Sequence, residues 1–156
     1  MTEESTTPDL EALSRRAIEA LNRRDLDAAL SLYAPDAVVE LSPVGAGMVA
    51  GGSVTGHAAM RRLWEELTSA FADFEMVVEE SHDLGCGVTL GVLLQRVRPH
   101  GSERLVERRY GSVASWRDGR VAHSKAYVDI DEARAAAERL AEERGGCGSY
   151  VKEKEP

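Results

Sequence analysis

The sequence of 156 residues has no long apolar run, no excess of basic residues and only two cysteines. A helix that crosses a membrane needs about 20 consecutive apolar residues, so no membrane span is predicted. The formal net charge of −8 disfavours nucleic acid and anionic membranes as partners, because both favour a cationic surface. The polar, acidic start does not resemble a secretory signal, and we therefore expect a cytoplasmic protein.

Motifs for metals, phosphates and dinucleotides are absent as well. The four histidines have no metal-ligand spacing, so we expect no metal site. Gly45 and Gly47 resemble a dinucleotide fingerprint only superficially, because they lie in a long loop instead of joining a strand to a helix. Cys86 and Cys147 give no disulfide framework, and the expected cytoplasmic setting disfavours a bond between them. The sequence therefore predicts no cofactor.

The first half of the chain reads as three helices and a strand. A threonine, a proline and an aspartate at 7–9 form a typical helix start, and the apolar residues that follow recur at helical spacing. Asp25 caps a second helix, which is expected to end at Pro35 because the residue before a proline avoids the α region. A strand at 37–41 and a glycine-rich loop at 42–55 precede the third helix. Its predicted apolar face consists of Met60, Leu63, Trp64, Leu67 and Phe71.

The second half changes to the alternating pattern of strands and closes with an alanine-rich helix from Asp131 to Arg144. Helices followed by sequential antiparallel strands are typical of an α+β domain, with the helices packed on one face of the sheet. We expect a single domain over residues 1–144 and a mobile polar tail over 145–156. The strands are predicted at 73–81, 86–98, 104–117 and 120–129.

Three segments carry a resemblance to a known family: AIEALNRRDLDAALSLYAPDAVVE from residue 17, GHAAMRRLWEEL from residue 56 and SWRDGRVAHSKAYVD from residue 115. Together they are similar to the SnoaL-like branch of the nuclear transport factor 2-like superfamily, which includes polyketide cyclase and ketosteroid isomerase-like folds. The resemblance implies a curved antiparallel sheet wrapped into a cone-shaped barrel around an apolar pocket. It also implies three N-terminal helices on the concave face, a C-terminal helix and a homodimer formed through the outer face of the sheet.

Two well-known activities of this superfamily are disfavoured by the residues present. The steroid isomerase branch needs an aspartate base, a tyrosine and a protonated aspartate, where this chain has Leu41, Ala17 and Ser112. The epoxide hydrolase branch needs Arg-x-Asp in a central strand and an aspartate in the last strand. This chain has Arg-Val-Arg at 96–98 and Ala126 at those places. Neither replacement set can move a proton or activate a water molecule.

A set of polar residues on one predicted strand remains available for chemistry. Alternation puts Arg108, Tyr110 and Ser112 on one face together with Ala114 and Trp116, and the resemblance points this face into the pocket. Tyr110 could donate a hydrogen bond at the pocket wall, and Arg108 could hold an anionic or enolic oxygen. The alternative is a tyrosine packed by its ring and an arginine in a salt bridge.

Two further candidates lie at helix starts. His57 could act as a general base, and Asp129 is the closest match to the carboxylate that SnoaL-like cyclases use near the last strand. Each has a structural alternative, which is an exposed first-turn residue for His57 and a helix cap for Asp129. Glu40 and His123 are expected to point away from the pocket. The residues expected to contact a ligand are Trp64, Trp116, Leu41 and Ser112.

The sequence thus predicts a protein with an apolar pocket for a small lipophilic molecule. One interpretation is acid–base chemistry of the cyclase, isomerase or lyase type without a cofactor. The other is a binding or dimerisation module without catalysis, and both stay open at this point. A cavity on which two or more titratable side chains converge would favour the enzyme.

Overall fold

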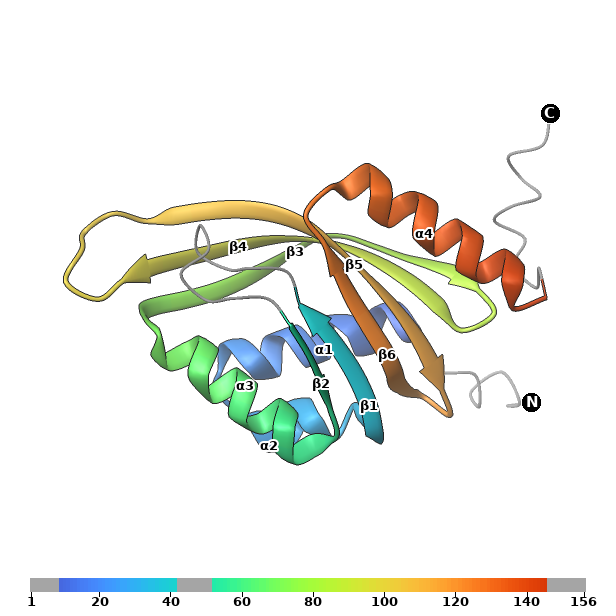
Figure 1. The fold of residues 1–156 in the computed structure, drawn as a ribbon, viewed down its shortest axis with the longest axis horizontal. Coiled ribbons are helices and arrows are strands. Elements are labelled where there is room, and N and C mark those ends of the chain that lie inside the picture. Colours follow the sequence, from blue (N-terminus) through green and yellow to red (C-terminus); the bar gives the residue numbers. More distant parts are fainter. Residues whose placement is uncertain (1–8, 42–51, 146–156) are drawn as a thin grey trace.

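The computed structural model describes residues 9–41 and 52–145. The helices in these ranges are α1 (Leu10–Asn22), α2 (Leu26–Leu30), α3 (His57–Ser69) and α4 (Ile130–Glu143). The strands are β1 (Tyr33–Leu41), β2 (Gly52–Thr55), β3 (Phe71–Gly85), β4 (Val88–Pro99), β5 (Val106–Arg117) and β6 (Arg120–Tyr127). They form a curved sheet flanked by helices, which confirms the predicted α+β class (Figure 1).

The sheet has the strand order β2-β1-β6-β5-β4-β3. Strands β3 to β6 form three successive antiparallel pairs, whereas β1 lies parallel to β6. The expectation of an all-antiparallel cone-shaped barrel needs correction on two points, because the sheet is mixed at β1–β6 and stays open, with β2 and β3 at its edges (Figure 1). Pairing between the first strand and the last is a long-range contact that no local pattern reveals.

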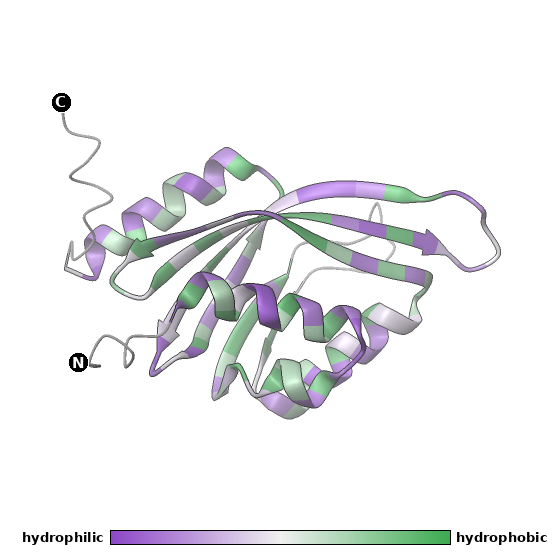
Figure 2. Ribbon diagram, turned by 180° about the vertical axis from the view of Figure 1, so that it is seen from behind, coloured by the Kyte–Doolittle hydropathy of each residue, from purple (hydrophilic) through white to green (hydrophobic). Residues whose placement is uncertain are grey.

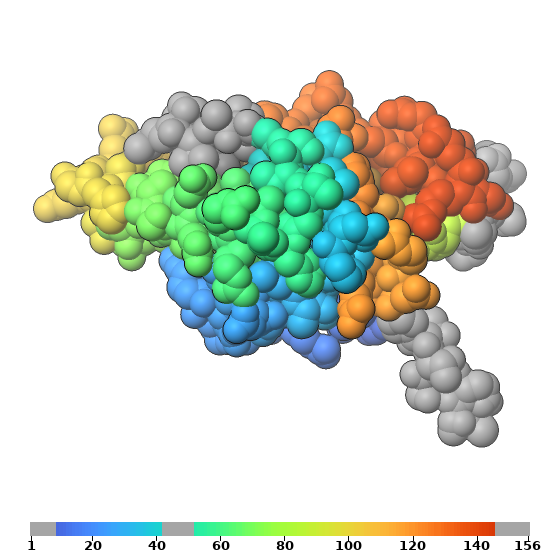
Figure 3. Space-filling view, turned by 60° about the horizontal axis from the view of Figure 1, so that its bottom comes forward, coloured from blue at the N-terminus to red at the C-terminus, as the bar shows by residue number. Residues whose placement is uncertain are grey.

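The helices divide between the two faces of the sheet. Helices α1, α2 and α3 cover the concave face and form one layer in the view from below, as expected (Figure 3). Helix α4 packs on the opposite face against β4 and β5. Figure 2 shows apolar and polar residues alternating along parts of the strands, as expected where one face is covered and the other is exposed. The concave face is therefore an interior lined by helices, and it is where a site can form.

Aspartate residues begin three of the four helices in the described part of the chain. Asp9 caps α1 by accepting a hydrogen bond from Ala12 N at 3.1 Å, and Asp25 caps α2 in the same way through Ala28 N. The predicted start at Thr7 and Pro8 lies outside the described residues. Asp129 caps α4. Such caps satisfy backbone donors that the first turn of a helix leaves unpaired.

The second and third helices end earlier than predicted, and one strand was missed. Helix α2 ends at Leu30 and not at Pro35, and Tyr33 already belongs to β1. Pro35 is tolerated there because the β1–β6 pairing shifts between Tyr33 and Val38, so no ladder hydrogen bond requires its missing N–H. Phe71 begins β3 instead of ending α3. The four-residue strand β2 was missed, because it lies at the end of the predicted glycine-rich loop.

The side chain of Asn22 fixes α1 to the edge strand β3. Its amide nitrogen donates to Met76 O at 2.8 Å, and its amide oxygen accepts from Met76 N at 2.9 Å. Arg24 adds a hydrogen bond from its guanidinium to Phe74 O at 3.0 Å. These bonds satisfy backbone groups that an edge strand leaves exposed, and they hold the end of α1 over the concave face.

The expectation that the cysteines stay unpaired was wrong for Cys86, which is disulfide-bonded. It lies in the β3–β4 turn with a φ of 57°, and Cys147 lies outside the described residues. Almost all of the predicted tail at 145–156 lies outside them too, so the tail and the single domain over 1–144 stay predictions. No helix in the described ranges is long and apolar enough to cross a membrane.

Candidate functional site

A cavity of about 90 Å³ lies between the concave face and the helices. Its floor comes from β1, β3, β4, β5 and β6, and its roof comes from α1 and α3. Apolar side chains form most of the wall, including Leu21, Leu41, Trp64 and Phe74. The polar residues among its described lining are Tyr33, Glu40, Gln95, Arg108, Tyr110, Ser112 and Ser124. The cavity is thus apolar with a few convergent polar groups, which is typical of a small-molecule site.

Tyr110 presents a hydrogen-bond donor inside this cavity. Its hydroxyl donates to Met76 Sδ at 3.1 Å, and a thioether is a weak acceptor. Burial raises the pKa of Tyr110 well above that of an ordinary tyrosine; the nearby Tyr33 raises it further, while the positive charge of Arg108 lowers it. The hydroxyl therefore keeps its proton at neutral pH and could exchange the sulfur for a better acceptor, such as a ligand oxygen.

Arg108 lies one inward position before Tyr110 on β5, as strand alternation predicts. Its guanidinium Nε is buried, and Gln95, its pairing partner on β4, is buried at 6% exposure. The cavity wall therefore carries a cationic donor and a neutral phenolic donor two residues apart. That pair suits an oxygen that is anionic or becomes so.

Tyr33 is an aromatic lining residue that sequence reasoning missed, and Gln95 is a missed polar one. Tyr33 was assigned to the apolar face of the second helix, whereas it is the first residue of β1. Its ring meets Trp64 edge to face, with 5.3 Å between the centroids and 68° between the planes. Burial raises the pKa of Tyr33 to about 12. Recognising that the second helix stops before Tyr33 would have placed this ring in the cavity.

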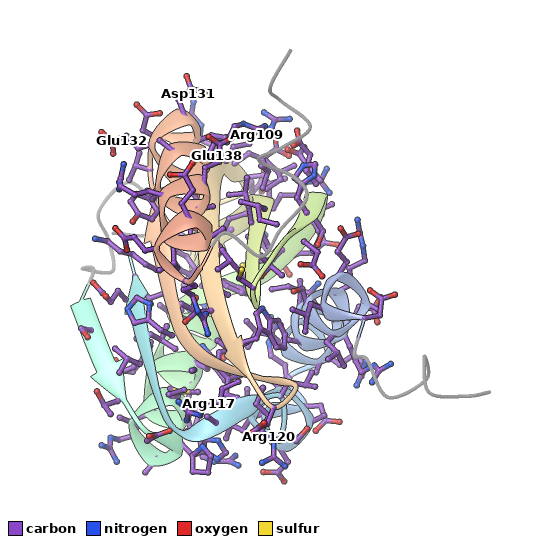
Figure 4. All side chains as sticks on the ribbon, turned by 90° about the vertical axis from the view of Figure 1, so that its right-hand side faces the viewer. Arg109, Arg117, Arg120, Asp131, Glu132 and Glu138 are labelled. Carbon is purple, nitrogen blue, oxygen red and sulfur yellow. The ribbon has the colours of Figure 1, made fainter. Side chains whose placement is uncertain are left out.

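Two of the four predicted catalytic residues lie away from the cavity. His57 Nε2 is 2.9 Å from Tyr33 O, so the ring holds the start of α3 against β1. Asp129 is exposed and accepts hydrogen bonds from Asp131 N and Glu132 N, at 2.9 and 3.2 Å. Figure 4 shows Asp131 and Glu132 on the first turn of α4, pointing outward. The helix cap is therefore the role observed for Asp129, whereas His57 is half-buried and not the exposed first-turn residue of its alternative. Neither is among the described lining residues.

Glu40 is the only acidic residue among the described lining residues of this cavity. Its Oε2 lies 2.6 Å from His123 Nε2, and His123 lines a groove on the outer face between β6 and α4. Glu40 therefore borders the cavity, although it was expected to point away from it, and its carboxylate pairs with His123, which lies on the outer face as expected. The described part of the cavity wall thus offers several hydrogen-bond donors, and its one carboxylate, that of Glu40, is paired with His123.

A second cavity of about 80 Å³ lies beside the first, and residues from α1, β1, β4, β5 and β6 line both. Trp116 lines the second cavity, and its indole Nε1 donates to Thr89 Oγ1 at 2.9 Å. Of the predicted ligand contacts, Trp64 and Leu41 line the first cavity only, Trp116 lines the second only, and Ser112 lines both. The structure thus brings together six of the eight predicted site residues around two adjoining cavities.

The profile of the SnoaL-like domain matches residues 14–124, which include most of both cavities. The chain belongs to the SnoaL-like domain family. In this SnoaL-like protein the residues that match the family are therefore the ones that build the concave face and its roof. No curated protein matches the chain.

Solved structures with the same fold are distant in sequence. An NTF2-like protein of unknown function from Burkholderia pseudomallei is 20% identical, with a TM-score of 0.69 over 84% of this chain and 98% of its own. TerC, co-crystallised with polyporic acid, is 15% identical with a TM-score of 0.67, over 83% and 98%. A Mycobacterium tuberculosis protein in complex with estradiol-17β-hemisuccinate is 17% identical with a TM-score of 0.63, over 77% and 93%. These likenesses show the NTF2-like fold.

The raised pKa of Tyr33 predicts a loss of stability in alkali. The folded protein holds the phenolic proton up to about pH 12, whereas the unfolded chain releases it near its ordinary pKa of 10. The stabilisation is therefore complete below pH 10 and is lost as the pH rises through 12. We expect the free energy of unfolding, measured by urea titration at pH 9, 10 and 11, to fall less steeply in Tyr33→Phe than in the wild type. Equal slopes would contradict the burial of this phenol.

Proposed function

We propose that this SnoaL-like protein binds a small lipophilic molecule in the first cavity and holds a carbonyl, enolic or carboxylate oxygen of it between Tyr110 and Arg108. The observation that carries the proposal is the Tyr110 hydroxyl, which donates only to a thioether while it lies beside a cationic side chain. Exchanging sulfur for an oxygen acceptor would strengthen that hydrogen bond, because thioethers accept weakly. Two distant relatives in fold contain bound organic molecules, polyporic acid and a steroid ester, which supports a ligand of this kind.

The same donors would assist one kind of chemistry. Removal of a proton next to a ketone leaves an enolate, whose charge a phenol and a guanidinium stabilise. Such catalysis would need a base, and the only carboxylate in the described cavity wall is paired with His123. This observation favours the alternative function, which is binding without catalysis. The cavity therefore supports ligand binding first and enolate stabilisation second.

Benzoate tests the binding half of the proposal, because its carboxylate supplies the oxygen and its ring supplies the apolar part. We expect the wild type to bind benzoate in isothermal titration calorimetry and Arg108→Met to bind it about 10- to 100-fold more weakly. Loss of a hydrogen bond to a charged group costs about 1.5–3 kcal/mol. Tyr110→Phe should cost only about 3- to 10-fold, because the wild-type hydroxyl gives up its hydrogen bond to Met76 Sδ when it donates to the carboxylate.

Arg109→Met is the matched control for this measurement. Arg109 is the next residue along β5, but it faces outward and pairs with Glu79 at 2.7 Å. Arg109→Met should therefore bind benzoate as the wild type does. Equal losses in Arg108→Met and Arg109→Met would mean that net charge, and not the cavity, determines the affinity, and the proposal would fail.

Hydrogen–deuterium exchange of 2-tetralone distinguishes the two proposed functions, catalysis and binding without catalysis. The ketone has acidic protons beside its carbonyl, and their exchange with D₂O can be followed by NMR. Exchange that is faster than in buffer and slower again in Tyr110→Phe would support enolate stabilisation. Binding without accelerated exchange would support the non-catalytic alternative.

We also propose that the chain forms a homodimer through the outer face of the sheet. The resemblance implies this arrangement, and the outer face carries a groove of about 400 Å³ between β5, β6 and α4. Sedimentation equilibrium tests the oligomeric state.

We propose the cytoplasm as the compartment of this protein on the sequence grounds given above, although disulfides such as that of Cys86 are uncommon there. Cell fractionation tests the compartment.

A further inference from the structure

The groove on the outer face of the sheet is larger than either cavity of the concave face. Strands β5 and β6 form its floor and one wall, and α4 forms the other wall (Figure 1). Its volume of about 400 Å³ falls within the range of about 300–1,000 Å³ that is usual for ligand sites, whereas the cavities of about 90 and 80 Å³ fall below it. The groove is therefore a candidate site in its own right.

The described lining of this outer groove combines apolar and polar side chains. The apolar part consists of Val113, Tyr127, Ala136 and Leu140, and the polar part of Ser115, His123, Lys125, Arg139 and Glu143. In the register of β5 with β6, Val113 pairs with Lys125, and Ser115 pairs with His123. Apolar and polar groups thus lie next to one another, as a molecule with an apolar body and a polar head requires.

Lys125 makes no ion pair with the acidic residues that the structure describes. Glu40 is its direct neighbour in the register of β1 with β6, but the carboxylate of Glu40 lies 2.6 Å from His123 Nε2. The Lys125 ammonium lies instead over the Tyr127 ring, 5.1 Å from the centroid. A ring face attracts a cation but provides no strong acceptor, so the donors of this ammonium stay available to a ligand.

Arg139 adds a second cation from the opposite wall, on α4. Its side chain is exposed and makes no ion pair in the described ranges, although Glu143 lies one helical turn further on. Arg134 of the same helix, by contrast, pairs with Glu80 Oε1 at 3.0 Å. A chain with a net charge of −8 thus presents two cations without ion pairs in one groove, and charge complementarity favours an anionic ligand.

We infer that the outer groove binds a small phosphate monoester, with the phosphate between Lys125 and Arg139 and an apolar body against Val113 and Leu140. A phosphate has three terminal oxygens and can therefore accept hydrogen bonds from the ammonium, the guanidinium and the hydroxyl of Ser115 together. This inference goes beyond the proposed function, because it concerns the opposite face of the sheet and involves neither Arg108 nor Tyr110.

Phenyl phosphate is the probe that tests this site. At pH 8 its phosphate is a dianion, since the second pKa of a phosphate monoester is about 6. We expect the wild type to bind it in isothermal titration calorimetry, and Lys125→Met and Arg139→Met each to bind it about 3- to 10-fold more weakly. The double variant should lose about 10- to 100-fold, because each substitution removes one charged contact from a partly exposed site. Inorganic phosphate, which lacks the ring, should bind about 10-fold more weakly than phenyl phosphate.

Two further variants are the controls for charge and for the choice of face. Arg134→Met removes the same charge from the same helix, but from the ion pair with Glu80, and should leave the affinity for phenyl phosphate unchanged. Arg108→Met, in the first cavity, should leave it unchanged as well. If Arg134→Met weakens binding as much as Arg139→Met does, net charge determines the affinity and the inference is overturned.

NMR spectroscopy of the wild-type protein locates the probe without any variant. Phenyl phosphate should shift the backbone amide signals of Val113, Lys125 and Leu140 and leave the indole N–H signals of Trp64 and Trp116 in place, because the two tryptophans line the concave cavities. A shift of the indole signals alone would place the probe on the concave face and overturn the inference. Benzoate and Arg108→Met test the proposed function separately, so either proposal can fail while the other holds.

Sedimentation equilibrium distinguishes the phosphate monoester from a second copy of the chain as the occupant of the groove. We expect phenyl phosphate to bind without changing the molecular mass of the protein in solution. If phenyl phosphate dissociates a dimer, a second copy occupies the groove in the absence of the probe. That result would overturn the assignment of the groove to a phosphate monoester, and so would a failure of phenyl phosphate to bind.

Discussion

Gly111→Ala should lower the free energy of unfolding by about 3 kcal/mol, because an added methyl group has no space there. Gly111 lies on the outward face of β5, where α4 crosses the sheet, and a Cβ atom would overlap the Cβ of Ala133. The overlapping atom is the first atom of a short side chain on a packed helix, so no flexible end can move aside. Helix α4 would have to shift as a whole. Urea unfolding followed by circular dichroism measures the loss.

Two further variants separate this overlap from a general effect of glycine replacement. Gly91→Ala, on the adjacent strand β4, would bring its methyl group no closer than 3.6 Å to Leu93, which is ordinary contact. It should change stability by less than about 0.5 kcal/mol, as for substitutions that meet no packing conflict. Ala133→Gly should recover part of the loss when combined with Gly111→Ala, although glycine in a helix itself costs about 1 kcal/mol. No recovery in the double variant would contradict the proposed overlap.

Local patterns predicted the features that depend on neighbouring residues. Alternation with a period of two is enough to place Arg108, Tyr110 and Ser112 on one face of β5, and the structure puts all three on the cavity wall. The helix-start pattern at Asp129 is equally local, and the residue caps α4. Whether the residues on the cavity wall bind a ligand stays a prediction.

Features that depend on distant residues could not be predicted in this way. The parallel pairing of β1 with β6 joins residues more than 80 positions apart, such as Val38 and His123. The need for glycine at 111 arises only when α4 crosses β5. Tyr33 was missed because the local sequence leaves two possibilities open. It lies three residues after the short helix α2, where the chain could form another helical turn or begin a strand. Pairing of β1 with β6 decides between them, and that contact is again long-range.

Trp64→Ala should have the largest effect on stability, a loss of about 3–5 kcal/mol. The side chain is 5% exposed, packs edge to face on Tyr33 and forms part of the roof of the first cavity. Its removal loses apolar burial and leaves a void that joins the cavity. Domains are usually stable by about 5–15 kcal/mol, so a large share of the total would be lost. Circular dichroism in urea measures it without relying on tryptophan fluorescence.

The position of Trp64 beside the first cavity gives this prediction a second part. The void left by Trp64→Ala has the shape of an indole, so free indole should raise the unfolding temperature of Trp64→Ala more than that of the wild type, since a ligand that binds only the folded state stabilises it. Trp64→Phe keeps an aromatic ring against Tyr33. It should therefore lose less stability than Trp64→Ala, and indole should raise its unfolding temperature less. Two results would contradict the role of Trp64 in the roof of the cavity. One is a loss in the free energy of unfolding below about 1 kcal/mol in Trp64→Ala, and the other is an equal rise in unfolding temperature with indole in all three proteins.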